Sequence, residues 1–176
     1  MKKIISFLFG ASLMLATSAN SAGMVGVKFG SGELDAENAA YTAGSTNYGS
    51  TSASADNQFG SLFAEIEIPM AEGLSLGVEY IPFEASIRLD KGESDTGADV
   101  SDYTTVYAAY MRPAGAGSVY VKAGYSQADI GTVTNANGTT VNSQDDTLEG
   151  PMVGIGFQSE EMANGMHARV EYTYTD

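Results

Sequence analysis

The chain has 176 residues, no cysteine and a formal net charge of −14 at pH 7. Without cysteine it has neither a disulfide framework nor the lipid attachment of a lipoprotein. The acidic balance argues against nucleic acid as a partner, because phosphate binding needs a basic footprint. The 21 glycines and 10 tyrosines, with gaps rich in serine, threonine and asparagine, favour an all-β protein.

Residues 1–22 have the pattern of a secretory signal peptide. Lys2 and Lys3 make a basic start, residues 4–16 are mainly apolar, and small residues follow in "TSANSA". The apolar run is short for a helix that crosses a bilayer, although an N-terminal anchor helix is the alternative. We expect cleavage after Ala22, with a cut after Ala19 as the other choice. The domain then covers residues 23–176.

Seven segments of the domain alternate apolar and polar residues with the period of a β-strand. In chain order they are 23–32, 59–69, 74–90, 102–113, 118–128, 150–158 and 167–176. The phase of the third segment flips after Pro82, which predicts a β-bulge there. The phase of the fourth stays open, since Val106, Ala108 and Tyr110 compete with the residues that follow each of them.

The gaps between these segments alternate between long and short. Long polar gaps at 33–58, 91–101 and 129–149 are separated by short ones at 70–73, 114–117 and 159–165. This rhythm is typical of a membrane β-barrel, in which tight turns lie on the periplasmic side and long loops lie outside. In lipid only a closed sheet satisfies the backbone groups of its strands.

Charged residues sit on the side of the strands opposite the apolar side chains. A barrel that turns its apolar side toward lipid encloses these charges, and they then need partners of opposite sign. We predict a lumenal charge network made of Lys28, Glu65, Glu67, Glu79, Lys122, Arg169 and Glu171. The alternative is a soluble β-sandwich whose charged side faces water.

The strand pairs "EIEIPMAEGLSLGVEYIPF" and "VYAAYMRPAGAGSVYVKAGYSQ", the first strand "GMVGVKFGSG" and the late "ARVEYTYTD" carry a family resemblance. The mature chain resembles the small outer-membrane barrels of the opacity-protein and outer-membrane-protein-A transmembrane-domain type. That resemblance implies an antiparallel up-and-down transmembrane β-barrel of eight strands in a Gram-negative bacterium. About seven strands are recognisable here, so we expect the closing strand to lie beyond Asp176, in a sequence truncated at its C-terminus.

The residues give no support for an enzyme. His167 is the only histidine, and the chain has no cysteine and no G-x-S-x-G motif. We therefore expect no catalytic residue, no cofactor and no metal site. Asp145 and Asp146 with Glu149 are the nearest approach to a cation site, but their spacing is not that of a calcium loop, and we expect a solvated loop.

The expected function is a structural outer-membrane barrel with long surface loops, serving envelope integrity or surface interaction, without an open pore. Its expected partners are outer-membrane lipid and lipopolysaccharide, the barrel assembly machinery, and host or phage surfaces that meet the loops. A small porin-like channel is one alternative, and a secreted soluble β-barrel that binds a ligand is the other.

Overall fold

The computed structural model describes residues 4–20, 23–38, 41–43, 46–48, 51–82, 85–90, 95–134, 140–142, 147–162 and 165–176. Its strands are β1 (Ile4–Asn20), β2 (Gly23–Asn38), β3 (Tyr41–Ala43), β4 (Thr46–Tyr48), β5 (Thr51–Glu67), β6 (Leu74–Ile81), β7 (Ala85–Asp90), β8 (Asp95–Pro113), β9 (Gly117–Thr134), β10 (Thr140–Asn142), β11 (Thr147–Ser159) and β12 (Met166–Thr175). None of the described residues forms a helix that is long and apolar enough to cross a membrane.

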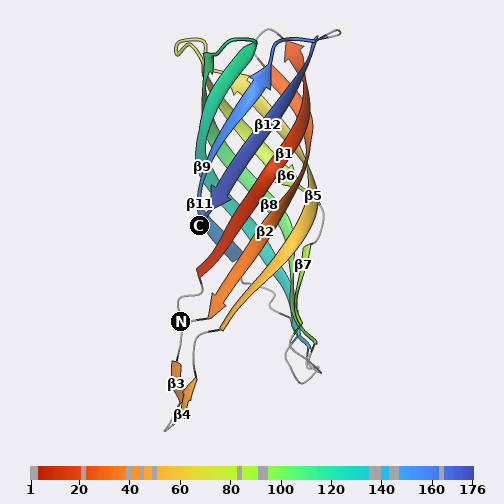
Figure 1. Cartoon of the computed structure of the whole chain (residues 1–176), viewed down its shortest axis with the longest axis vertical. Coiled ribbons are helices and arrows are strands. Elements are labelled where there is room, and N and C mark those ends of the chain that lie inside the picture. The colour runs from red at the N-terminus through yellow and green to blue at the C-terminus, as the bar shows by residue number, and fades with distance from the viewer. Residues whose placement is uncertain are drawn as a thin grey trace.

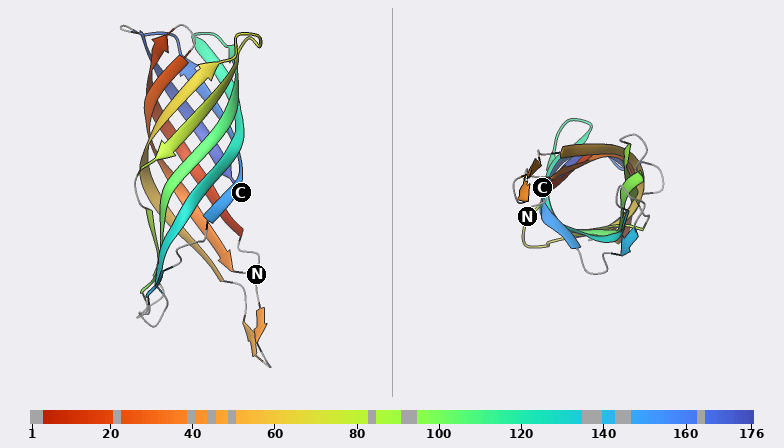
Figure 2. Two further views of the ribbon diagram at one scale, coloured as in Figure 1. Left: turned by 180° about the vertical axis from the view of Figure 1, so that it is seen from behind. Right: turned by 90° about the horizontal axis from the view of Figure 1, so that it is seen from below.

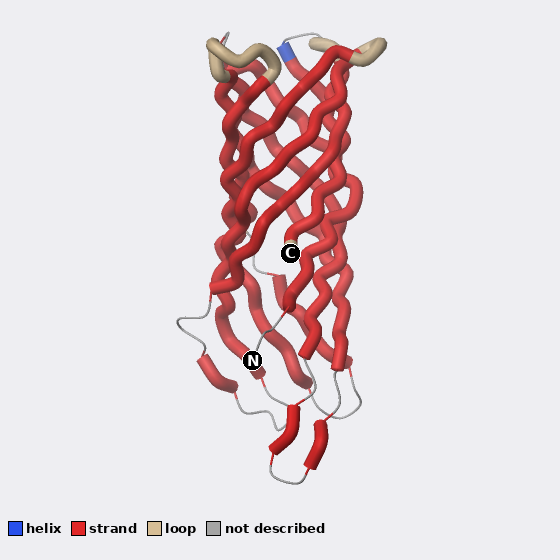
Figure 3. Tube along the Cα trace, turned by 90° about the vertical axis from the view of Figure 1, so that its left-hand side faces the viewer, coloured by secondary structure: helices blue, strands red, loops and turns tan. Residues whose placement is uncertain are grey.

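Seven strands form an antiparallel, up-and-down sheet in the order β2-β5-β6-β8-β9-β11-β12. The sheet curls round on itself (Figures 1 and 2), and the tube in Figure 3 shows the steep tilt of its strands. The connections 68–73 and 114–116, together with residues 160–162 and 165, lie at one end, which we call the short-turn end. The opposite end, where β12 finishes, is the long-loop end. All seven strands correspond to segments that the alternation predicts.

The segment β1 lies between β12 and β2. It pairs antiparallel with both, through nine residue pairs with β12 and fourteen with β2. Residues 4–20 are those for which a cleaved signal peptide is expected, and residues 1–3, 21 and 22 lie outside the described part. The backbone therefore places this segment where the sheet would otherwise present two open edges.

A one-residue irregularity accompanies Pro82, as the phase flip predicts. Ile81 of β6 lies opposite Tyr103 of β8, and Ala85 of β7 lies opposite Val100. Four steps along the chain on one side therefore match three on the other, which is the count of a β-bulge. On β8, Asp102 has a positive φ of 52° at the point where the register with β9 also shifts.

The strands extend further than the alternation predicts, so the expected long loops at 33–58 and 129–149 are corrected. β2 and β5 stay paired as far as Asn38 and Thr51, and β8 pairs with β9 out to Gly97 and Thr134. These stretches consist of polar and small residues on both faces of the strand, because neither face needs to be apolar there. The alternation that marks a strand is therefore not visible in the sequence. Backbone pairing, which is independent of side-chain polarity, continues the sheet toward the long-loop end (Figure 1).

Most valines of the strands point outward, and six charged side chains point inward. Val121 and Val170 are 54% and 51% exposed. Their neighbours in the sequence, Lys122 and Arg169, are 4% and 2% exposed. Val25 and Val153 are likewise exposed and Lys28 is buried. In the fourth segment Val106 and Tyr110 face outward, and Tyr107 and Ala109 are buried inside, which settles the phase that the sequence leaves open.

Candidate functional site

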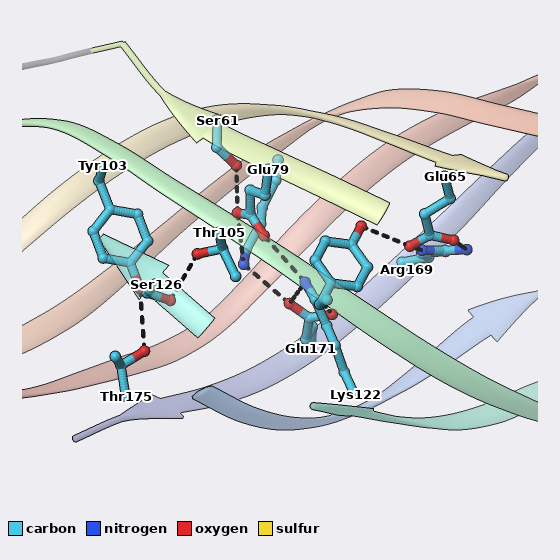
Figure 4. Close-up of polar contacts among 12 residues, drawn as sticks. Ser61, Glu65, Glu79, Tyr103, Thr105, Lys122, Ser126, Arg169, Glu171 and Thr175 are labelled. Carbon is cyan, nitrogen blue, oxygen red and sulfur yellow. Dashed lines mark hydrogen bonds and ion pairs between the residues drawn. The ribbon is translucent and has the colours of Figure 1, made fainter. Parts of the chain in front are cut away.

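Four charged side chains from four strands meet in the interior of the sheet (Figure 4). Lys28 Nζ on β2 lies 3.0 Å from a carboxylate oxygen of Glu79 on β6 and 3.0 Å from one of Glu171 on β12. Lys122 Nζ on β9 contacts the same two carboxylates at 3.1 and 3.2 Å. Each lysine thus bridges both glutamates. We call this set the charge ring.

A second ion pair lies beside the charge ring, nearer the short-turn end. The Arg169 guanidinium donates two hydrogen bonds to the two oxygens of Glu65 on β5, at 2.6 and 2.8 Å. Arg169 Nε also donates to Gln158 Oε1 at 2.6 Å. A bidentate pair of this kind fixes geometry as well as charge. With Lys28, Lys122 and Arg169 against Glu65, Glu79 and Glu171, the six charges balance.

Tyrosines complete the hydrogen bonding of the buried carboxylates. Tyr107 Oη donates to Glu65 at 2.8 Å, and Tyr120 Oη donates to Glu171 at 3.0 Å. Ser61 donates to Glu79 at 2.7 Å. Among the described residues, every buried side-chain nitrogen or oxygen has a partner. Because ions are costly to bury without partners, this complete pairing is what makes a charged interior tenable.

Two glycines make room for the tyrosine rings. Gly77 lies directly opposite Tyr107, and Gly156 lies directly opposite Tyr120. A β-carbon on either glycine would overlap the ring of the tyrosine facing it. Each ring therefore covers a glycine on the neighbouring strand and reaches its carboxylate from there. The alternation of small and large inward residues keeps the interior filled.

Cavities lie on both sides of the buried charges. One of about 10 Å³, the size of a single water, touches Lys28, Glu79 and Tyr103 on the side of the long-loop end. Another of about 470 Å³ opens at the short-turn end, and Arg169 and Glu65 line it together with Ser75, Arg112 and Glu161. Between the two, the charge ring and the Arg169–Glu65 pair occupy the interior.

The structure brings together six of the seven residues expected in the lumenal network. Lys28, Glu65, Glu79, Lys122, Arg169 and Glu171 are all buried. Glu67 is the correction: it has the same parity as Glu65, but it ends β5, is exposed and lines the larger cavity. Its position near a strand end decides its exposure, because the larger cavity opens the interior to solvent there.

Sequence reasoning misses the uncharged members of the network: Tyr107, Tyr120, Ser61 and Gln158. A signal for Tyr120 exists in its inward parity and in the glycines of β11, the neighbouring strand, whereas Tyr107 belongs to the segment whose phase the sequence leaves open. Tyr103 on β8 is buried as well, and its Oη lies 3.1 Å from Thr175 Oγ1. Its phase follows from the irregularity at Asp102.

The remaining candidates do not gather into a site. His167 is half-buried at the start of β12, with its Nδ1 3.2 Å from the Ser159 carbonyl oxygen. Asp145 and Asp146 lie outside the described residues, and Glu149 is exposed. Within the described part of the chain, no three histidine, aspartate or glutamate side chains are grouped so that they could hold a metal ion.

Exposed aromatic and apolar residues form a band around the outside. Tyr80, Tyr125 and Tyr174 lie toward the long-loop end of this band, whereas Tyr110 and Phe157 lie toward the short-turn end. Valine, leucine and isoleucine fill the outer face between them, and past Tyr125 the outward residues of β9 become polar at Gln127 and Asp129. At the edge of the band nearer the long-loop end, Tyr80 Oη donates to Asp102 at 2.6 Å.

No protein-family model, curated protein or solved structure matches this chain. The resemblance to opacity-type and outer-membrane-protein-A-type barrels therefore stays a prediction.

Proposed function

We propose that this chain is a bacterial outer-membrane β-barrel of the eight-stranded type. In this proposal it is exported by its N-terminal signal, inserted by the barrel assembly machinery, and held among lipid and lipopolysaccharide. Its role is structural: it anchors an extended surface part that serves envelope integrity or contact with other surfaces. The proposal includes no catalytic activity, cofactor or metal.

The observation that carries the proposal is the inversion of the fold. A soluble protein buries its valines and leaves lysines in water, whereas here Val121 and Val153 are exposed while Lys28 and Lys122 are buried. A continuous apolar outer face of this extent needs a cover. Hydrocarbon is the cover that suits a curled sheet with strands of this length, flanked by tyrosines at both edges.

The interior favours an anchor over a channel. An eight-stranded barrel leaves space only for its own side chains, and the charge ring with the Arg169–Glu65 pair takes up that space. The larger cavity, about 470 Å³, ends on Arg169 and Glu65. A porin-like channel remains the second candidate because this cavity gives water access to the interior from the short-turn end. An apolar ligand-binding interior finds no support in six buried charges.

The surface role rests on the strands that continue past the apolar band. β8 and β9 stay paired from Thr104 and Gln127 out to Gly97 and Thr134. These extensions carry polar outward residues where the side chains are described, and β3 and β4 form a separate hairpin beyond β2 and β5 (Figure 1). Such a projection suits contact outside the membrane, with host or phage surfaces as the proposed partners.

The test is fractionation of the full chain expressed in a Gram-negative host. We expect the folded protein in the outer-membrane fraction, extracted only by detergent, with a gel mobility that changes on boiling. Planar-bilayer recording of the same preparation is expected to show no steady ion steps, which separates the anchor from the channel. A folded chain recovered from the soluble fraction without detergent would sink the proposal.

A further inference from the structure

The facing edges of β2 and β12 form a gap that is one strand wide, which we call the seam. β1 occupies it along most of its length and is antiparallel to both neighbours. Leu13, for example, lies between Phe29 of β2 and Val170 of β12, and Met14 lies between Lys28 and Arg169. One strand thus satisfies the backbone groups of two edges, which would otherwise be templates for wrong pairing.

Both ladders show the same irregularity. From Phe9 to Ser12 is three steps along β1, whereas its partners move two steps, from Thr173 to Glu171 on one side and from Gly32 to Gly30 on the other. One extra residue of β1 is therefore accommodated by both edges at one level. The extra residue lies in β1, which both ladders share, and it fixes one register of β1 against both edges, since a one-residue slip would exchange the two faces of the strand.

The seam also sets a chemical requirement on its occupant. The buried charges on the seven other strands already balance, and every described buried side-chain nitrogen or oxygen has a partner. A charge at the register of Met14, between Lys28 and Arg169, would have no partner of its own. The segment Ile4–Asn20 contains no Asp, Glu, Lys or Arg, so its composition meets this requirement.

We propose that the seam is a strand-acceptor site and that the chain's own N-terminal segment, Ile4–Asn20, fills it in the unprocessed protein. Closure and processing are then coupled: the uncut chain carries its own closing strand, and cleavage after Ala22 frees the seam for another uncharged strand. The pairing within the chain does not depend on a membrane location, whereas its coupling to cleavage rests on the export signal of the proposed function.

Disulfide trapping tests the proposal cleanly, because the natural chain has no cysteine. The full chain, refolded from denaturant into detergent so that no peptidase acts, carries Leu13→Cys with either Phe29→Cys or Val170→Cys. Directly opposed residues in an antiparallel pair have α-carbons about 4.5–5.5 Å apart, within disulfide range. The matched control is Leu13→Cys with Val25→Cys, since Val25 lies opposite Thr17, roughly 13 Å along the strand.

We expect both opposed pairs to form intrachain disulfides in most molecules, and the control pair to stay at background. A third pair, Phe29→Cys with Val170→Cys, probes the seam directly, because these residues flank β1 and join only if β2 and β12 pair with each other. Disulfides in that third pair, cross-links between chains, or no cross-link in either opposed pair would each overturn the proposal. Cross-linking of the opposed pairs in a chain that stays soluble without detergent would support it and refute the membrane location separately.

Discussion

The ammonium of Lys122 lies 3.8 Å from the centre of the Tyr107 ring while it contacts Glu79 and Glu171. The hydroxyl of the same tyrosine donates to Glu65, the partner of Arg169. Tyr107 therefore joins the charge ring to the second ion pair, through its ring on one side and its oxygen on the other. Substitutions that remove the hydroxyl, the ring or one of the charges measure how much each contributes to stability.

Replacing Tyr107 with phenylalanine keeps the ring beneath Lys122 and deletes the hydrogen bond to Glu65. We expect the free energy of unfolding to fall by about 1–3 kcal/mol, because a buried carboxylate oxygen loses a donor. Urea unfolding of the refolded protein in lipid vesicles measures it. Tyr110→Phe is the matched control, since Tyr110 is exposed on the same strand, and its change is expected to be within about 0.5 kcal/mol. Equal losses in the two variants would contradict the role of the Tyr107 hydroxyl.

Lys28→Met leaves Glu79 and Glu171 with only Lys122 between them. Breaking a buried pair by removing one partner costs about 3–5 kcal/mol, because the remaining charge is not compensated. We expect a loss of this size in the same unfolding measurement, and part of it restored when Glu79→Gln is added. Arg112→Met removes a cation that is exposed near the short-turn end and serves as the control. A double variant as unstable as the sum of its single changes would show that charge balance is not the cause.

Gly77→Ala places a methyl group where the Tyr107 ring lies. We expect a destabilisation of about 1–3 kcal/mol from overpacking, because the ring has to leave its position and its hydrogen bond to Glu65. The same alanine in a Tyr107→Ala background is expected to cost much less. Gly23→Ala, whose new β-carbon meets the Glu65 carbonyl oxygen at 3.4 Å, is the control. The equilibrium unfolding curve of each variant decides, and an unchanged midpoint for Gly77→Ala would be the contrary result.

An arginine on the outer face tests what covers it. Val121→Arg puts a charge in the middle of the apolar band and is expected to cost about 2–4 kcal/mol in vesicles, whereas the cost near an interface is about 0–1 kcal/mol. Gln127→Arg lies on the same outward face of β9 beyond Tyr125 and serves as that interface control. Refolding yield and unfolding in vesicles are compared for the two. A tolerated arginine at 121, with both variants alike, would place that face in water.

The sequence predicts the seven strands, and the two faces of all of them except β8, because the demand on each face is uniform along most of a strand. Around Val153 apolar residues alternate with glycines, and around Lys122 small or apolar residues alternate with larger or charged ones. These stretches are long enough for the two-residue period of a strand to be visible. It misses the extensions of β2, β5, β8 and β9, where both faces are polar and no period is visible. It also misses the role of Tyr107, which depends on the glycine opposite it on another strand, and strand pairing is a long-range property that composition does not encode.

Position along the barrel axis also decides which carboxylates are buried. Glu67 and Glu65 are indistinguishable by parity, and only the height of each along the barrel axis separates an exposed carboxylate from a buried one. The pairing of β1 with β2 and β12 is not predicted from the sequence, because residues 4–20 have the composition of an export signal. The seam that accepts them exists only after the other strands have curled.

The buried charges come from β2, β5, β6, β9 and β12, and tyrosines or an amide from β8, β9 and β11 hold them, so each of the seven strands contributes. Lys28 and Glu171 are 143 positions apart, and they meet only when the whole curl is complete. Slipping any contributing strand by one residue would turn its ion outward and leave its partner stranded. A misaligned curl would therefore lose these buried ion pairs, so the network favours the one register in which all seven strands contribute to it.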